Sequence, residues 1–160
     1  MESGLLKNKP SQKAFSLVEL MIVVALIAIF TGIAAPSFQE YIQRTNLKSA
    51  ARGIASDIYL SKTRAISENR YYKISFDTSG ATYKIRQGDS SGSSYSDFPN
   101  KGLYVFGDGL SFSSSTFTGN EIEFQPRGTC SQGNIILSNN KGFKATIAIT
   151  VTGRTYVSYS

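Results

Sequence analysis

The longest apolar run in the chain is the feature that most constrains its fold. Between Phe15 and Ala35 the only charged residue is Glu19, and residues 20–30 carry no polar side chain at all. As an α-helix, this run would be about 31 Å long, close to the thickness of the hydrocarbon core of a bilayer. The sequence therefore predicts a membrane-spanning helix. Its one carboxylate would cost about 2.5–3.5 kcal/mol at mid-membrane.

The residues before this run are polar and basic. Residues 1–14 include Lys7, Lys9 and Lys13, and an excess of lysine predicts that this segment stays in the cytoplasm. The apolar run is not followed by a small-residue cleavage site of the kind that ordinary secretory signals carry. We therefore expect a single-pass membrane protein whose remaining residues lie on the side of the membrane opposite the cytoplasm.

The basic segment and the start of the apolar run together resemble the leader of type IV prepilins. The resemblance rests on the sequence Phe15-Ser-Leu-Val-Glu19 and on Pro36. It implies that a prepilin peptidase cuts between Ala14 and Phe15 and that the new Phe15 amine is methylated. Glu19 and Pro36 then become residues 5 and 22 of the mature chain, both implied to act in subunit assembly. Ala14 departs from the glycine that is usual in the family.

After Pro36 the helical pattern resumes and becomes amphipathic. Apolar residues recur at spacings of 4, 3, 4 and 7, which places them on one helix face. These residues are Leu47, Ala51, Ile54, Ile58 and Ala65. Glu40 and Arg44 form a favourable i,i+4 pair on another face. We expect the helix to continue to about Ser67 and its apolar face to cover the rest of the chain.

A basic stripe runs beside that apolar face. Arg44, Lys48 and Arg52 follow one another at intervals of four residues, which aligns them along a helix. Such a stripe is compatible with a solvated face, with a contact to a neighbouring subunit or an anionic lipid headgroup, and with DNA. The sequence leaves these alternatives open.

The second half of the chain has the period of two that is typical of strands. The predicted strands are Tyr71–Asp77, Ala81–Arg86, Leu103–Phe106, Leu110–Ser113, Glu121–Gln125, Asn134–Ser138, Phe143–Thr152 and Arg154–Tyr159. Residues 87–102 are rich in serine and glycine and are expected to form a mobile loop. A long helix followed by antiparallel strands predicts an α+β fold with the sheet packed on the helix.

This half extends the resemblance. Residues 50–58, Phe124-Gln-Pro-Arg-Gly128, residues 133–137 and Gly153-Arg154 are similar to the H-type minor pseudopilins of type II secretion and the related minor pilins of type IV pili. The resemblance implies a structural subunit that packs against other subunits through its N-terminal helix in a pseudopilus or a pilus. The sequence does not choose between these two machines.

The predicted domain organisation follows from both halves of the chain. Residues 1–14 form the cleaved leader and residues 15–36 the transmembrane half of the helix. Residues 37–67 form its amphipathic half. Residues 68–160 form the periplasmic β-domain, which is long enough for one modest core.

Candidate catalytic and metal-binding residues are few. The chain has no histidine, the commonest general base and metal ligand. Cys130 is the one cysteine and is expected to be a buried small hydrophobe. Glu121 and Glu123 share one strand face and could share a cation, although a solvated strand face is favoured. Asp89 and Asp97 in the loop lack the ligand density of a calcium site. We expect no enzyme activity, no cofactor and no metal.

Two other functions compete with the structural reading. A minor pilin that receives DNA would use basic residues near the C-terminus, and the candidates are Arg127, Lys141, Lys144 and Arg154. Tyr156 or Tyr159 would then stack on a base. The second arginine that often follows the Gly-Arg pair in such pilins is missing here. The other alternative is a plain single-span anchor that carries a β-domain.

Overall fold

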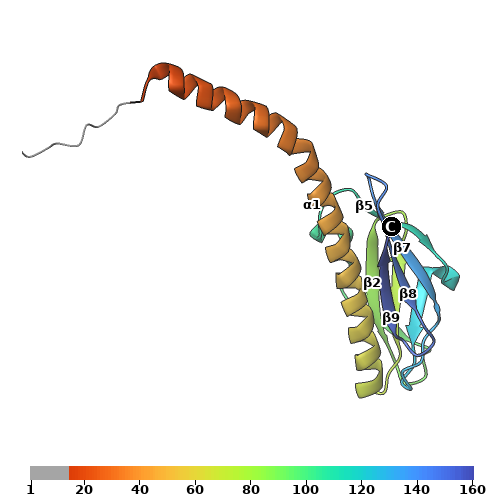
Figure 1. Ribbon diagram of the computed structural model, residues 1–160. Coiled ribbons are helices and arrows are strands. Elements are labelled where there is room, and N and C mark those ends of the chain that lie inside the picture. The colour runs from red at the N-terminus through yellow and green to blue at the C-terminus, as the bar shows by residue number, and fades with distance from the viewer. Residues whose placement is uncertain (1–14) are drawn as a thin grey trace, which may run out of the picture. The chain divides into compact units, whose positions relative to one another are not determined.

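One long helix, α1 (Leu17–Ser67), precedes all the strands. The structure is a computed structural model that describes residues 15–160, and the side chains of all of these except residues 33–37. The leader, residues 1–14, and the Pro36 side chain lie outside this description. The chain divides into two compact units, one ending at Phe38 and one running from Gln39 to Ser160. Each unit contains part of α1, which is drawn as a continuous ribbon in Figure 1.

In the first unit the helix leaves its apolar side chains exposed. The large apolar residues from Phe15 to Phe30 are all more than two fifths exposed, and Glu19 lies in the first turn. Within the residues that the structure describes, no helix reaches both the length and the hydropathy of a membrane span. The transmembrane half, residues 15–36, stays a prediction.

In the second unit the amphipathic half of α1 buries the predicted face. Leu47, Ala51, Ile54, Ile58 and Ala65 are all at most 2% exposed, which confirms the pattern. The helix also ends at Ser67, as predicted. Two strands that pack along this half are visible beside it in Figure 1, β2 (Thr82–Gly88) and β9 (Thr155–Tyr159).

The strands form two antiparallel sheets. The first has the order β3-β2-β1-β6, with β4 also paired to β2, and the second has the order β5-β7-β8-β9. Besides β2 and β9, the strands are β1 (Tyr72–Asp77), β3 (Tyr95–Asp97), β4 (Lys101–Gly102), β5 (Leu110–Ser115), β6 (Glu121–Phe124), β7 (Gly133–Asn139) and β8 (Lys144–Ile149). The α+β class predicted from the sequence is confirmed.

Aromatic side chains join the two sheets in the core. Phe76 of β1 meets Phe112 of β5 edge to face, with ring centroids 5.4 Å apart. Tyr83 of β2 packs on the same Phe112 ring, and its hydroxyl donates a hydrogen bond of 2.6 Å to Asp57 of α1. Burial and the Asp57 carboxylate raise the pKa of Tyr83 far above its ordinary value. Asp57 also accepts from Lys101 at 2.8 Å, so one helix carboxylate links α1 to β2 and β4.

Three local predictions were wrong. Residues 103–105 form a 3-10 helix, because only Leu103 is buried while Tyr104 and Val105 point outward. The expected loop 87–102 contains β3 and β4, which are held by polar contacts to neighbouring strands such as that between Tyr95 and Glu123. The predicted strand Phe143–Thr152 extends too far, because β8 ends at Ile149 and a turn follows, which leaves Val151 49% exposed.

The contact between α1 and the sheets predicts a clear mutational contrast. Ile54→Ala would remove a fully buried side chain at the centre of this contact, and we expect a loss of about 2–5 kcal/mol in the free energy of unfolding. Leu60→Ala is the matched control, because Leu60 lies on the same helix with 42% of its surface exposed. Denaturant unfolding followed by near-ultraviolet circular dichroism would measure both. Equal losses would contradict this account of the core.

Candidate functional site

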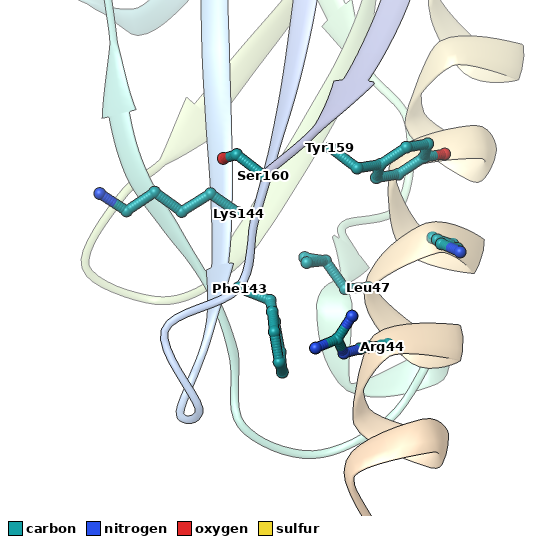
Figure 2. Close-up of a pocket in the computed structure, with 7 residues that line it drawn as sticks. Arg44, Leu47, Phe143, Lys144, Tyr159 and Ser160 are labelled. Carbon is teal, nitrogen blue, oxygen red and sulfur yellow. The ribbon is translucent and has the colours of Figure 1, made fainter.

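A pocket opens where α1 meets the ends of β8 and β9. Its volume is about 180 Å³, and it lies wholly within the unit Gln39–Ser160. The lining residues are Arg44, Leu47, Lys48, Phe143, Lys144, Tyr159 and Ser160 (Figure 2). Two members of the basic stripe on the helix thus face aromatic residues that come from the far end of the sequence.

Each of the two helix cations lies over an aromatic ring. The Arg44 guanidinium carbon is 3.8 Å from the centroid of the Phe143 ring, and the Lys48 ammonium is 5.7 Å from that of Tyr159. Such contacts are worth about 0.5–1 kcal/mol at exposed sites. Figure 2 shows the Arg44 guanidinium beside the Phe143 ring, with Leu47 next to it. Leu47 is buried and forms the apolar base between the two cations.

Arg44 also keeps the ion pair that the sequence predicted. Its guanidinium donates to the Glu40 carboxylate at 2.7 Å, and both side chains are half exposed. An exposed pair of this kind is worth only a few tenths of a kcal/mol. Arg44 therefore stays accessible from the pocket side while Glu40 holds it from the preceding turn.

The turn between β7 and β8 places Phe143 against the helix. The side-chain oxygen of Asn139 accepts hydrogen bonds from the backbone N–H groups of Lys141 and Phe143, at 3.1 and 3.0 Å. The Asn139 side-chain nitrogen donates to the carbonyl of Gln43 at 3.4 Å. Asn139 is buried, so its amide satisfies the turn and the helix together. The hydrogen bond to Gln43 therefore holds the β7–β8 turn against the helix beside Arg44.

The four predicted basic residues fall into two pairs. Lys141 lies in this turn and Lys144 begins β8, so both are close to the pocket. In Figure 2 the Lys144 side chain extends away from Arg44, and its backbone pairs with Ser160 in the β-ladder.

Arg127 and Arg154 lie elsewhere. Their glycine neighbours Gly128 and Gly153 both have positive φ angles, and both pack close to Lys62 of α1. Lys62 donates a hydrogen bond of 2.8 Å to the carbonyl of Thr152. Since Lys62 follows Arg44 by 18 residues, the two pairs are separated by about 27 Å along the helix. The structure does not bring the four cations into one patch.

The acidic residues that the sequence singled out have partners within the protein. Lys73 lies 3.2 Å from Glu121 and 3.5 Å from Glu123. Burial raises the pKa of Glu121, but a hydrogen bond from Ser75 and the charge of Lys73 outweigh it and leave the pKa lowered. Asp97 pairs with Arg86 at 3.1 Å.

The Asp89 carboxylate accepts hydrogen bonds from residues of its own loop. The hydroxyl of Ser91 and the backbone of Ser93 donate to its carboxylate and lower its pKa to about 2. Across the described residues 15–160, acidic residues and cysteine nowhere gather in groups of three that could hold a metal ion. The acids act here as partners for neighbouring hydroxyls and cations.

Cys130 is buried, as the sequence predicted. Its thiol donates to the Thr150 carbonyl at 3.3 Å, and burial raises its pKa. A protonated, enclosed thiol is a poor nucleophile. Cys130 therefore belongs to the core.

Sequence reasoning found the basic stripe but missed its aromatic partner Phe143. Phe143 was predicted to begin the strand 143–152, whereas it lies in the turn before β8 and is only partly buried. The segment Asn139-Asn140-Lys141-Gly142 has the asparagine and glycine that favour a turn, but a turn motif does not specify which residue Phe143 will contact. Identifying that neighbour as Arg44 required the tertiary structure.

Comparison with known proteins gives two family matches. Residues 9–35 match the prokaryotic N-terminal methylation motif. Residues 50–153 match the family described as type II transport protein GspH. The two matches share α1, since one covers the start of this helix and the other begins in its amphipathic half.

Curated relatives match about a third of the chain. The fimbrial protein EcpC of Eikenella corrodens is 42% identical over 60 residues, which cover 34% of this chain and 39% of that protein. A fimbrial protein of Pseudomonas aeruginosa is 46% identical over 57 residues, covering 36% of this chain and 34% of its own length. The chain thus spans less than half the length of these relatives.

Solved structures match more than two thirds of the chain. The type IV minor pilin FimU of Pseudomonas aeruginosa has a TM-score of 0.58 at 20% identity, covering 74% of this chain and 92% of its own. The minor pseudopilin EpsH of the Vibrio cholerae type 2 secretion system has a TM-score of 0.57 at 10% identity, covering 71% and 96%. At these identities the likeness shows the fold. The match over residues 50–153, which is more than half of the sequence, shows the family: the chain belongs to the type II transport protein GspH family.

Proposed function

We propose that this protein is a minor structural subunit of a type IV pilus or a type II secretion pseudopilus. The proposal rests on the presence of two family matches in one chain. They are an N-terminal methylation motif over residues 9–35 and a GspH domain over residues 50–153. A methylation motif alone would fit any pilin-like protein. The GspH domain narrows the proposal to the minor subunits.

The exposed first half of α1 supports assembly with other subunits. Its large apolar side chains from Phe15 to Phe30 are uncovered in the single chain. Full burial of each such side chain is favourable by about 1.5–3 kcal/mol of transfer free energy relative to exposure to water. In the proposed function lipid covers them before assembly, in the inner membrane with the β-domain in the periplasm. Helices of other subunits cover them in the filament.

Processing of the leader is part of the same proposal. A prepilin peptidase would cut between Ala14, which lies outside the described residues, and Phe15. The methyltransferase would then modify the Phe15 amine. Pro36 would act in assembly at position 22 of the mature chain. The role proposed for the chain is structural and not catalytic.

Glu19 would serve assembly as a charge partner. An unpaired carboxylate among apolar neighbours is costly, whereas a desolvated pair with a positive N-terminus offsets that cost. In the proposed filament the Glu19 carboxylate faces the Phe15 amine of its own or a neighbouring subunit. This pairing would select correctly processed subunits, because the amine exists only after cleavage.

The two alternatives gain less support. The DNA receptor rests on four cations acting together, and these lie in two pairs about 27 Å apart along α1. The plain membrane anchor leaves the GspH match over residues 50–153 without a role. The proposal includes both the pilus and the pseudopilus, because FimU and EpsH match the fold with nearly equal TM-scores.

Processing can be tested directly on the mature protein. We expect intact-mass and N-terminal peptide analysis to show a chain that begins at Phe15 with one added methyl group on its amine. A chain that retains Met1, or that begins after Ala35, would contradict the prepilin-type processing.

Glu19 offers a test of assembly. We expect Glu19→Val to leave membrane insertion intact, because it only removes a charge from an apolar segment, and to reduce the amount of the subunit in sheared filaments. Immunoblots of the membrane and sheared fractions would measure both. Glu40→Gln is the matched control, since it removes a carboxylate from the exposed part of the same helix. Equal incorporation of the Glu19 variant and the wild type would contradict the proposed pairing.

A further inference from the structure

We propose that Arg44 and Lys48, each held over an aromatic ring of the β-domain, bind the phosphate of an anionic phospholipid headgroup. The inference rests on the proposed function, because it assumes that the first half of α1 is anchored in a membrane before assembly. It adds a ligand to a pocket whose residues the family assignment leaves without a role.

The two cations converge on one small space. They follow each other by four residues on α1, so they lie on the same helix face, and both line the pocket of about 180 Å³. The Phe143 and Tyr159 rings lie 3.8 and 5.7 Å from them and restrict where each can swing. A preorganised arginine with a lysine beside it suits a phosphate, which arginine binds through two parallel hydrogen bonds.

The surroundings leave an excess of positive charge. The charged groups at this end of the domain are Arg44, Lys48, Lys141, Lys144, Glu40 and Asp108. Asp108 belongs here because its neighbours Gly107 and Gly109 adjoin Asn46 and Asn140. These six side chains sum to a formal charge of +2 (4 − 2), and a terminal carboxylate at Ser160, which lines the pocket, would lower the sum to +1 (2 − 1). Glu40 pairs with Arg44 from the turn below and does not line the pocket.

The position of the pocket along the helix favours a lipid over other anions. Tyr41 and Ile42 are exposed just before it, and tyrosine is enriched at the interface next to a membrane-spanning helix. Arg44 follows Tyr41 by about 4.5 Å along the axis, and a headgroup layer is about 5–8 Å thick on each side. Helix side chains also lean toward the N-terminus, so both cations reach back toward the predicted membrane side.

The test compares lipid adducts on the full chain. The protein would be purified in a mild detergent and titrated with phosphatidylglycerol or phosphatidylcholine, with bound lipid counted by native mass spectrometry. We expect wild type to prefer phosphatidylglycerol. The double variant R44Q/K48Q should bind it about fivefold more weakly for each cation removed. The variant R44K/K48R keeps both charges and should retain the preference, which separates lost charge from lost folding.

The matched control is R127Q/R154Q, which removes two exposed arginines from the other end of the domain and should leave the preference unchanged. Equal binding of both lipids by wild type would overturn the inference. So would an equal loss in the control, and so would displacement of the lipid by millimolar inorganic phosphate. If R44Q/K48Q kept its lipid but disappeared from sheared filaments, the pocket would be a protein contact and the lipid site would be refuted.

Membrane anchoring is read separately, from whether the wild-type chain stays with membranes after an alkaline wash. A chain released by that wash would contradict the anchoring in the proposed function. Retention together with no headgroup preference would contradict only the lipid site.

Discussion

The close packing of α1 on the two sheets is the contact on which the domain depends. The buried face of the helix alternates large and small residues, with Ala50, Ala51 and Ala65 fully enclosed. Small residues let the helix lie near the strands. At Gly53 the missing side chain leaves room for the residue after the 3-10 helix, since a Cβ atom there would stand 2.5 Å from the Phe106 ring. Because the β-strands have no other α-helix to cover them within residues 39–160, this face organises the whole core.

The packing of α1 on the sheets also forms the pocket. Asn139 ties the β7–β8 turn to the Gln43 carbonyl, and the ladder between β8 and β9 then places Tyr159 beside Lys48. In both contacts the two residues lie far apart in the sequence. The pocket is therefore a consequence of how the end of the chain folds back along the amphipathic half of α1, and it would be lost with that packing.

Much of this fold was predictable because its patterns are local. The apolar face of α1 follows from helical spacing, and most strand positions follow from alternation around turn residues such as Gly142 and Gly153. The strand β3 was missed because contacts such as that between Asp97 and Arg86 hold it, with no aliphatic pattern. The pocket was half predicted: the spacing of Arg44 and Lys48 revealed the cations, but no local rule pairs Phe143 with a residue 99 positions earlier (143 − 44).

Asp57 and Glu19 are two acids on α1 that differ in whether the same chain supplies partners for their carboxylates. Asp57 finds its partners within the domain, as it accepts from Tyr83 at 2.6 Å and from Lys101 at 2.8 Å. Glu19 lies among exposed apolar side chains, and within the described residues no hydrogen bond or ion pair to its carboxylate is formed. A carboxylate of this kind is stable in water but expensive once its neighbours are buried. Burial of the first half of α1 therefore favours either protonation of Glu19 or a cation beside it, and in the proposed filament the Phe15 amine is that cation.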